Sequence, residues 1–126
     1  MKALGLLVCL AACAQTERGS GVAVRTDGHQ VLVEGNRAMR ALLVELEWDG
    51  EVTALVPGPD AARLTIFETD WEPGTRHAKV LVSDGRGVKL PARGAVIEAQ
   101  GTGALRILSA EAAEDGPRAV DVEVKP

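Results

Sequence analysis

Hydrophobic residues recur at every second position along most of this chain. The clearest run covers residues 42–48, where Leu42, Val44, Leu46 and Trp48 alternate with Leu43, Glu45 and Glu47. A period of two places alternate side chains on one side of a β-strand, so this run predicts a half-buried strand with Trp48 in the core. Comparable runs lie near residues 22–24, 31–33, 52–56, 64–66, 78–82, 95–99, 105–107 and 120–124.

Turn-forming pairs separate these runs. Asp-Gly occurs at 27–28, 49–50, 84–85 and 115–116, and Pro-Gly at 57–58 and 73–74. Glycine and aspartate tolerate the positive φ angles of tight turns, so each Asp-Gly pair is expected to mark a chain reversal. The best helical candidate, Asp60 to Arg63, is one turn long. About nine short strands at this spacing predict an all-β sandwich, and an immunoglobulin-like arrangement is one form it could take.

The first thirteen residues have the pattern of a targeting signal. Lys2 is followed by an apolar run from Ala3 to Ala12, which is too short to cross a bilayer as a helix. Leu10-Ala11-Ala12-Cys13 resembles the lipobox of bacterial lipoproteins, which implies a signal peptide at 1–12 and lipid on Cys13. An ordinary secretory signal cut nearby is the alternative. Residues 13–21 would then be the lipidated cysteine and a polar tether, and residues 22–126 the folded domain.

Charge and cysteine content restrict the function further. Lys2 is the only charged residue before Cys13, so the remainder has 13 basic against 18 acidic residues, a net charge of −5. This sign argues against a nucleic-acid partner, which would require a basic surface. Cys9 would leave with the signal and Cys13 would carry lipid, so the domain would have no disulfide. We therefore expect packing alone to stabilise it.

Residues 21–125 resemble cohesin domains in the order and spacing of their strands. Residues 39–49 resemble the third cohesin strand, which ends in an aromatic-Asp pair, here Trp48-Asp49. The later resemblance lies in residues 77–82, 94–103, 105–107 and 119–124. Cohesins are nine-stranded jelly-roll β-sandwiches, related to carbohydrate-binding modules, that bind dockerin domains through one sheet. The resemblance implies that fold here, and leaves open whether a dockerin is the partner.

Four large apolar residues occupy the outward register of alternating strands: Leu43, Phe67, Leu81 and Leu108. They belong to the third, fifth, sixth and eighth strands, which the cohesin resemblance places in one sheet in the order eight, three, six, five. The same register contains Glu45, Glu47, Thr65, His77, Lys79 and Arg106. An apolar centre with a charged rim is typical of a protein interface. A loop or the tether covering this patch is the alternative.

Other sites have less support. His29 and His77 are too few for a zinc centre, and no EF-hand pattern surrounds Glu68, Asp70 and Glu72, although calcium stays open. The serines lack a nucleophile motif, so we expect no enzyme activity, cofactor or metal. Trp71 lies in a turn-rich loop, where it is a candidate for ligand binding or a lid on the sandwich.

These patterns together predict a lipid-anchored extracytoplasmic binding module with a protein partner. A carbohydrate-binding module and a structural envelope lipoprotein are the alternatives. The expected location is the bacterial cell envelope. Because Ala14, rather than aspartate, follows Cys13, the outer membrane is favoured if the cell is Gram-negative.

Overall fold

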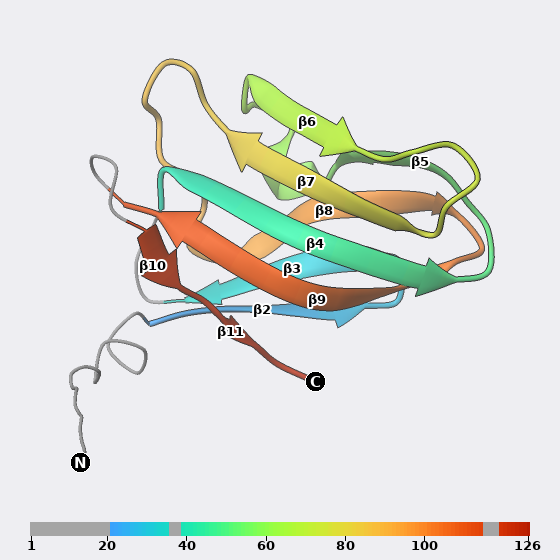
Figure 1. Cartoon of the computed structure of the whole chain (residues 1–126). Coiled ribbons are helices and arrows are strands. Elements are labelled where there is room, and N and C mark those ends of the chain that lie inside the picture. The colour runs from blue at the N-terminus through green and yellow to red at the C-terminus, as the bar shows by residue number, and fades with distance from the viewer. Residues whose placement is uncertain (1–20, 36–38, 115–118) are drawn as a thin grey trace, which may run out of the picture.

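The computed structural model describes residues 21–35, 39–114 and 119–126, and for residues 119–121 it describes the backbone alone. Two five-stranded sheets pack face to face as a β-sandwich (Figure 1). The all-β prediction is confirmed. The predicted signal peptide, the lipidation site Cys13 and the tether up to residue 20 lie outside the described residues. So does the Asp-Gly pair at 115–116.

The first sheet, called the front sheet here, has the strand order β10-β9-β4-β7-β6. All of its neighbouring strands are antiparallel. Its four longer strands are the eighth, third, sixth and fifth of the sequence-based prediction, in the predicted order. The bounds of the five strands are Ala119–Asp121 for β10, Ala104–Ala113 for β9, Ala41–Asp49 for β4, His77–Ser83 for β7 and Ile66–Asp70 for β6.

The second sheet, called the back sheet, has the strand order β11-β2-β3-β8-β5. Its strands are antiparallel except for β11 and β2, which run in parallel. The bounds are Glu123–Val124 for β11, Val22–Asp27 for β2, Gln30–Gly35 for β3, Gly94–Gly101 for β8 and Val52–Pro57 for β5. A single 3₁₀ turn, η2 at Pro59–Ala61, follows β5 where one helical turn was expected.

The last predicted strand divides between the two sheets. Residues 119–121 form β10 beside β9, and residues 123–124 form β11 beside β2. The amide of Lys125 extends the second pairing by donating to the carbonyl of Val24 at 2.8 Å. The C-terminal segment therefore closes one edge of both sheets (Figure 1).

Aliphatic side chains fill the space between the sheets. On β4, Leu42, Val44 and Leu46 are fully buried, and Trp48 is 3% exposed, so the predicted inner register of this strand is confirmed. Their opposite residues on β7 are Val82, Val80 and Ala78, which are also fully buried. The back sheet contributes Val24, Val31, Val33 and Ile97 to the same core. Close packing of branched side chains therefore stabilises a sandwich with few aromatic residues.

The turn predictions are confirmed where the backbone reverses tightly. Gly28 joins β2 to β3 at φ +62°, and Gly50 joins β4 to β5 at φ +85°, angles that favour glycine. Asp84-Gly85 also lies in a tight turn, because the amide of Gly87 donates to the carbonyl of Asp84 at 3.1 Å, but this turn begins a long connection from β7 in the front sheet to β8 in the back sheet. No helix within the described ranges is long and apolar enough to cross a membrane.

Candidate partner-binding face

The outer side of the front sheet is arranged in rows that run across its strands. Residues that are directly opposite in the backbone register point to the same side of a sheet. The central row runs from Glu68 on β6 through Leu81 on β7 and Leu43 on β4 to Glu111 on β9. Two leucines thus lie side by side between two carboxylates. Leu43 is 39% exposed, and Leu81 is partly exposed.

The next row carries two of the predicted polar residues, Lys79 and Glu45. It runs from Asp70 through Lys79 and Glu45 to Ser109. Glu45 accepts a hydrogen bond at 3.2 Å from the hydroxyl of Ser109, and its other oxygen lies 2.5 Å from His77 Nε2. The histidine contact, with smaller contributions from Ser109 and Lys79, lowers the pKa of the Glu45 carboxyl. Glu45 is therefore held as an oriented anion near the middle of the face.

Arg106 forms a second polar cluster at the β4–β5 end of the face. Its guanidinium donates to Glu47 Oε2 from Nη2 at 2.6 Å and from Nε at 3.0 Å, and to Asp49 Oδ2 from Nη1 at 3.0 Å. Glu47 also lies opposite His77 in the backbone register. Because these side chains are largely exposed, the ion pairs order the surface more than they stabilise the fold.

Leu108 reaches the outer surface through a β-bulge. The register between β4 and β9 shifts so that Glu45 lies opposite Ser109 while Leu46 lies opposite Ile107. The extra residue on β9 is Leu108, and its side chain is 48% exposed. A bulge of this kind redirects a side chain and increases the local twist. Leu108 therefore joins the leucine pair as an exposed apolar residue of the front sheet.

Phe67 does not lie on this face, so its predicted outward orientation is wrong. Phe67 lies opposite Val82, which is fully buried, and its ring packs against the core. Ile66, opposite the partly exposed Ser83, takes the outer position on β6 instead. The alternation of Leu64 and Ile66 in the sequence predicts one strand with both residues inside, which would place Phe67 outside. Leu64 packs on the core from the loop before β6, so it does not set the register of that strand.

Thr65 also differs from its predicted place in the outer register. It precedes β6, and its hydroxyl accepts a hydrogen bond from the amide of Gly85 at 2.7 Å. Thr65 thus contacts the start of the connection between β7 and β8. The remaining predicted residues of the face, Leu43, Leu81, Leu108, Glu45 and Lys79, all lie on the front sheet as expected. Whether they bind a partner stays a prediction.

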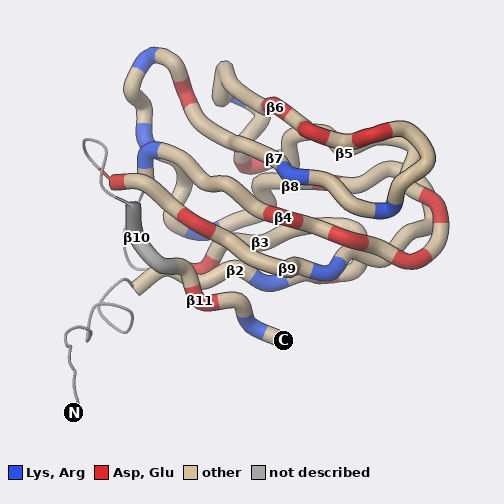
Figure 2. Tube along the Cα trace, in the orientation of Figure 1, with Lys and Arg blue, Asp and Glu red and all other residues tan. Residues whose placement is uncertain are grey.

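Acidic residues outnumber basic ones along β4, β6, β7 and β9 of the front sheet (Figure 2). The cations are Lys79 and Arg106, together with the titratable His77. Within the part of the chain that the structure describes, Glu68, Asp70 and Glu111 form no ion pair. The acidic side chains on this surface are Glu45, Glu47, Asp49, Glu68, Asp70 and Glu111. The face thus combines exposed leucines with a negative rim.

Trp71 acts as a lid on the sandwich, one of the two roles considered from the sequence. Its ring packs edge-on against Trp48, with centroids 5.1 Å apart and planes at 84°. The indole N–H donates to the carbonyl of Thr75 at 3.0 Å, which closes the loop between β6 and β7. Trp71 and Phe67 both pack against the core. They form no aromatic platform on the outer surface.

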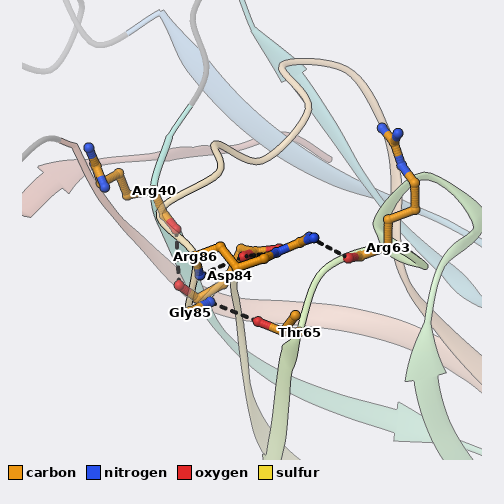
Figure 3. A network of polar contacts seen from close by, with 7 residues as sticks. Arg40, Arg63, Thr65, Asp84, Gly85 and Arg86 are labelled. Atoms are coloured by element: carbon orange, nitrogen blue, oxygen red, sulfur yellow. Dashed lines mark hydrogen bonds and ion pairs between the residues drawn. The ribbon is translucent and has the colours of Figure 1, made fainter.

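A polar cluster around Asp84 was not predicted from the sequence. The Asp84 side chain is fully buried and accepts hydrogen bonds from Arg86 at 2.7 Å to Nη2, 3.0 Å to Nε and 2.7 Å to the backbone amide. Arg86 Nη2 also donates to the carbonyl of Arg63 at 3.1 Å (Figure 3). The Arg86 contacts lower the pKa of Asp84 to about 2. This cluster joins the start of the β7–β8 connection to the turn before β6.

The two histidines have different surroundings. His29 is exposed in the turn between β2 and β3, while His77 contacts Glu45 on the front sheet. Within the described ranges, no group of three or more His, Cys, Asp or Glu side chains is arranged to hold a metal ion. Glu68, Asp70 and Glu72, which were weighed as calcium ligands, are exposed at the end of β6 and in the following loop.

Comparison with known proteins places the fold. No family model matches the sequence, and no curated protein matches it. The structure is similar to that of a non-cellulosomal cohesin from the hyperthermophilic archaeon Archaeoglobus fulgidus, with a TM-score of 0.65. The match covers 83% of this chain and 86% of the archaeal chain at 16% sequence identity. By its fold, this chain is a cohesin-like β-sandwich.

Proposed function

We propose that this chain is a lipid-anchored binding module of the bacterial cell envelope that engages a protein partner through the outer side of its front sheet. The central observation is the exposed leucine pair Leu43 and Leu81, flanked by carboxylates and extended by Leu108. Exposed leucines on a sheet do not stabilise the isolated domain, whereas an apolar centre with a charged rim suits a protein interface.

The acidic rim defines the chemistry of the partner. Glu68, Asp70 and Glu111 have no ion-pair partner within the described part of the chain, so a partner surface rich in lysine or arginine would complement them. Complementary charge speeds association and selects the partner, while the leucines supply the buried apolar area. We therefore propose a partner with a basic rim around an apolar contact. The archaeal cohesin supports a binding role over a catalytic one through fold likeness alone.

Substitutions on the two sheets test the binding face, with an exposed residue of the back sheet as the control. Leu43 on the front sheet and Val124 on β11 of the back sheet are both 39% exposed. In crosslinking pull-downs from intact envelopes, Leu43→Asp combined with Leu81→Asp should abolish capture of the partner that the natural chain captures. Val124→Asp should retain it. Both variants should keep a thermal unfolding midpoint close to that of the natural chain. Equal capture by the two variants would overturn the proposed face.

The anchor is tested separately at Cys13. Cys13→Ala should block lipid attachment and leave an uncleaved or soluble form in membrane fractionation. Membrane partitioning that does not change on this substitution would refute the lipoprotein part of the proposal. The binding face could still be correct in that case, because capture by Leu43 and Leu81 does not depend on the lipid.

A further inference from the structure

A concave surface lies at one end of the sandwich, away from the outer side of the front sheet. It is a groove of about 490 Å³ between the segment that follows η2 and the connection from β7 to β8. A volume of this size suits a small ligand. Its lining combines cations with apolar side chains and one carboxylate: Asp60, Arg63, Leu64, Arg86, Val88, Lys89 and Pro91.

Hydrogen bonds to Asp84 and to the carbonyl of Arg63 hold the Arg86 side chain in this lining. Its Nε and Nη2 atoms donate to the fully buried carboxylate of Asp84, and Nη2 also donates to the carbonyl of Arg63. The Arg86 side chain as a whole is nevertheless 62% exposed. A planar donor group held by a buried anion keeps its orientation, and Figure 3 shows Arg86 bonded to Asp84 and to the carbonyl of Arg63. Binding to Arg86 therefore requires little ordering of its side chain.

The other two cations of the groove form no ion pair within the described part of the chain. Arg63 and Lys89 are exposed, and no carboxylate in the described ranges forms an ion pair with either. Asp60, the acidic residue of the lining, already accepts a hydrogen bond from the amide of Ala95 at 2.8 Å. Gly94 lies so close to Asp60 that a Cβ there would be 2.5 Å from Oδ2. The carboxylate is thus held against the β8 backbone.

This charge pattern runs against that of the whole chain, whose net charge is −4. A concave site in whose lining three cations outnumber one carboxylate attracts anions even where the protein as a whole repels them. The apolar part of the lining adds a second requirement. Val88 is 49% exposed within the groove, next to Pro91 and the partly buried Leu64. A ligand that also contacts these residues would carry an apolar portion beside its charge.

From these observations we infer that the groove binds a phosphate-type anion carried by a partly apolar molecule, with Arg63, Arg86 and Lys89 as the anion-binding residues. Arg86 provides an oriented donor edge, and Arg63 and Lys89 provide the uncompensated charge. This site shares no residue with the leucine pair of the front sheet, so it does not depend on the proposed protein partner.

Inorganic phosphate is the first probe. Titration of the ¹⁵N-labelled chain should shift the amide resonances of Arg86, Gly87, Val88 and Lys89, with a dissociation constant in the millimolar range. Arg63→Ser combined with Lys89→Ser should weaken this binding by about tenfold. The control Arg76→Ser removes an exposed arginine from the β6–β7 loop and should leave it unchanged. The site would be refuted by the absence of shifts in these resonances, or by equal binding in both variants.

Vesicles distinguish a free phosphate ligand from a lipid headgroup. Flotation is carried out with the soluble form of the Cys13→Ala chain, so that neither a lipid anchor nor an uncleaved apolar segment contributes, on vesicles of phosphatidylglycerol or of phosphatidylcholine. Binding to phosphatidylglycerol that is lost in the Arg63→Ser, Lys89→Ser variant would assign the site to a lipid headgroup. Phosphate-dependent shifts without flotation would assign it to a soluble anion. The site would be overturned if flotation persists after Arg63 and Lys89 are replaced by serine and phosphate shifts none of the named resonances.

Discussion

The two sides of strand β4 differ in what their residues do. The inner residues Leu42, Val44 and Leu46 are fully buried against β7 and the back sheet. The outer residues alternate with them, and include Leu43 and Glu45, which face solvent or other surface side chains. Packing constrains the volume of every inner side chain, because the interior has no room to adjust. The outer side has no such constraint, so the leucines there are not explained by stability.

The largest effect should come from shortening an inner side chain. Leu46→Ala removes a fully buried side chain at the centre of β4, opposite Ala78 and Ile107. The transfer and cavity terms together predict a loss of about 2–5 kcal/mol in the free energy of unfolding. Urea denaturation monitored by tryptophan fluorescence measures this loss. A loss comparable to that of an outer residue would mean that the assigned register is wrong.

Phe67→Ala tests whether Phe67 belongs to the inner side. Because the ring is only partly buried, the loss should fall below the roughly 3–5 kcal/mol typical of a fully buried phenylalanine. It should still exceed the loss at an exposed position. The same variant should capture the partner as well as the natural chain does, since its side chain faces the core. Loss of capture without loss of stability would mean that Phe67 lies on the outer surface.

The buried carboxylate of Asp84 should make the stability of the protein depend on pH. Its pKa is lowered to about 2 from an ordinary value of 3.8, so its contribution to stability is present above the ordinary value. That contribution is lost as the pH falls through about 4 to about 2. Thermal unfolding midpoints over this range should fall more steeply for the natural chain than for Asp84→Asn. Parallel pH profiles would show that Asp84 is not held as an anion.

The smallest effect is expected at Leu43. Leu43→Ala removes an outer side chain that is 39% exposed, so the free energy of unfolding should change by about 0.5 kcal/mol or less. Its effect on partner capture should be much larger than its effect on stability. Chemical denaturation and pull-down of the same preparation provide both readouts. A loss of stability as large as that of Leu46→Ala would erase the distinction between the two sides.

Most of the fold could be predicted from the sequence because alternation is a local property. Each run of buried and exposed residues specifies its own strand, and Trp48 followed the register of Val44 and Leu46 into the core. The order of the four longer strands of the front sheet came from the cohesin resemblance. The division of the last strand was not predicted, since residues 120–124 alternate without a break. It depends on two edges, β9 and β2, that only the assembled sandwich provides.

The candidate sites were less predictable because they depend on contacts between distant segments. Alternation alone could not place Phe67, whose side depends on where β6 begins after the loop that holds Leu64. Asp84 lies in an Asp-Gly pair, a pattern typical of exposed turns, yet it is buried by Arg86 and neighbouring segments. The groove unites residues that follow η2 with residues that follow β7. The available signal was Arg63 on the first segment and Arg86 and Lys89 on the second, and only the fold brings them together.

The parallel pairing of β11 with β2 has a mechanical consequence. These strands lie near the two ends of the described chain, with Glu123 and Val124 opposite Ala23 and Val24. When the ends of a parallel pair are pulled in opposite directions, the strands slide along each other and their hydrogen bonds are loaded together. An antiparallel hairpin pulled at its open end would lose its bonds one at a time. A module tethered at its N-terminus should therefore resist tension applied through its C-terminus better than tension that peels one strand away.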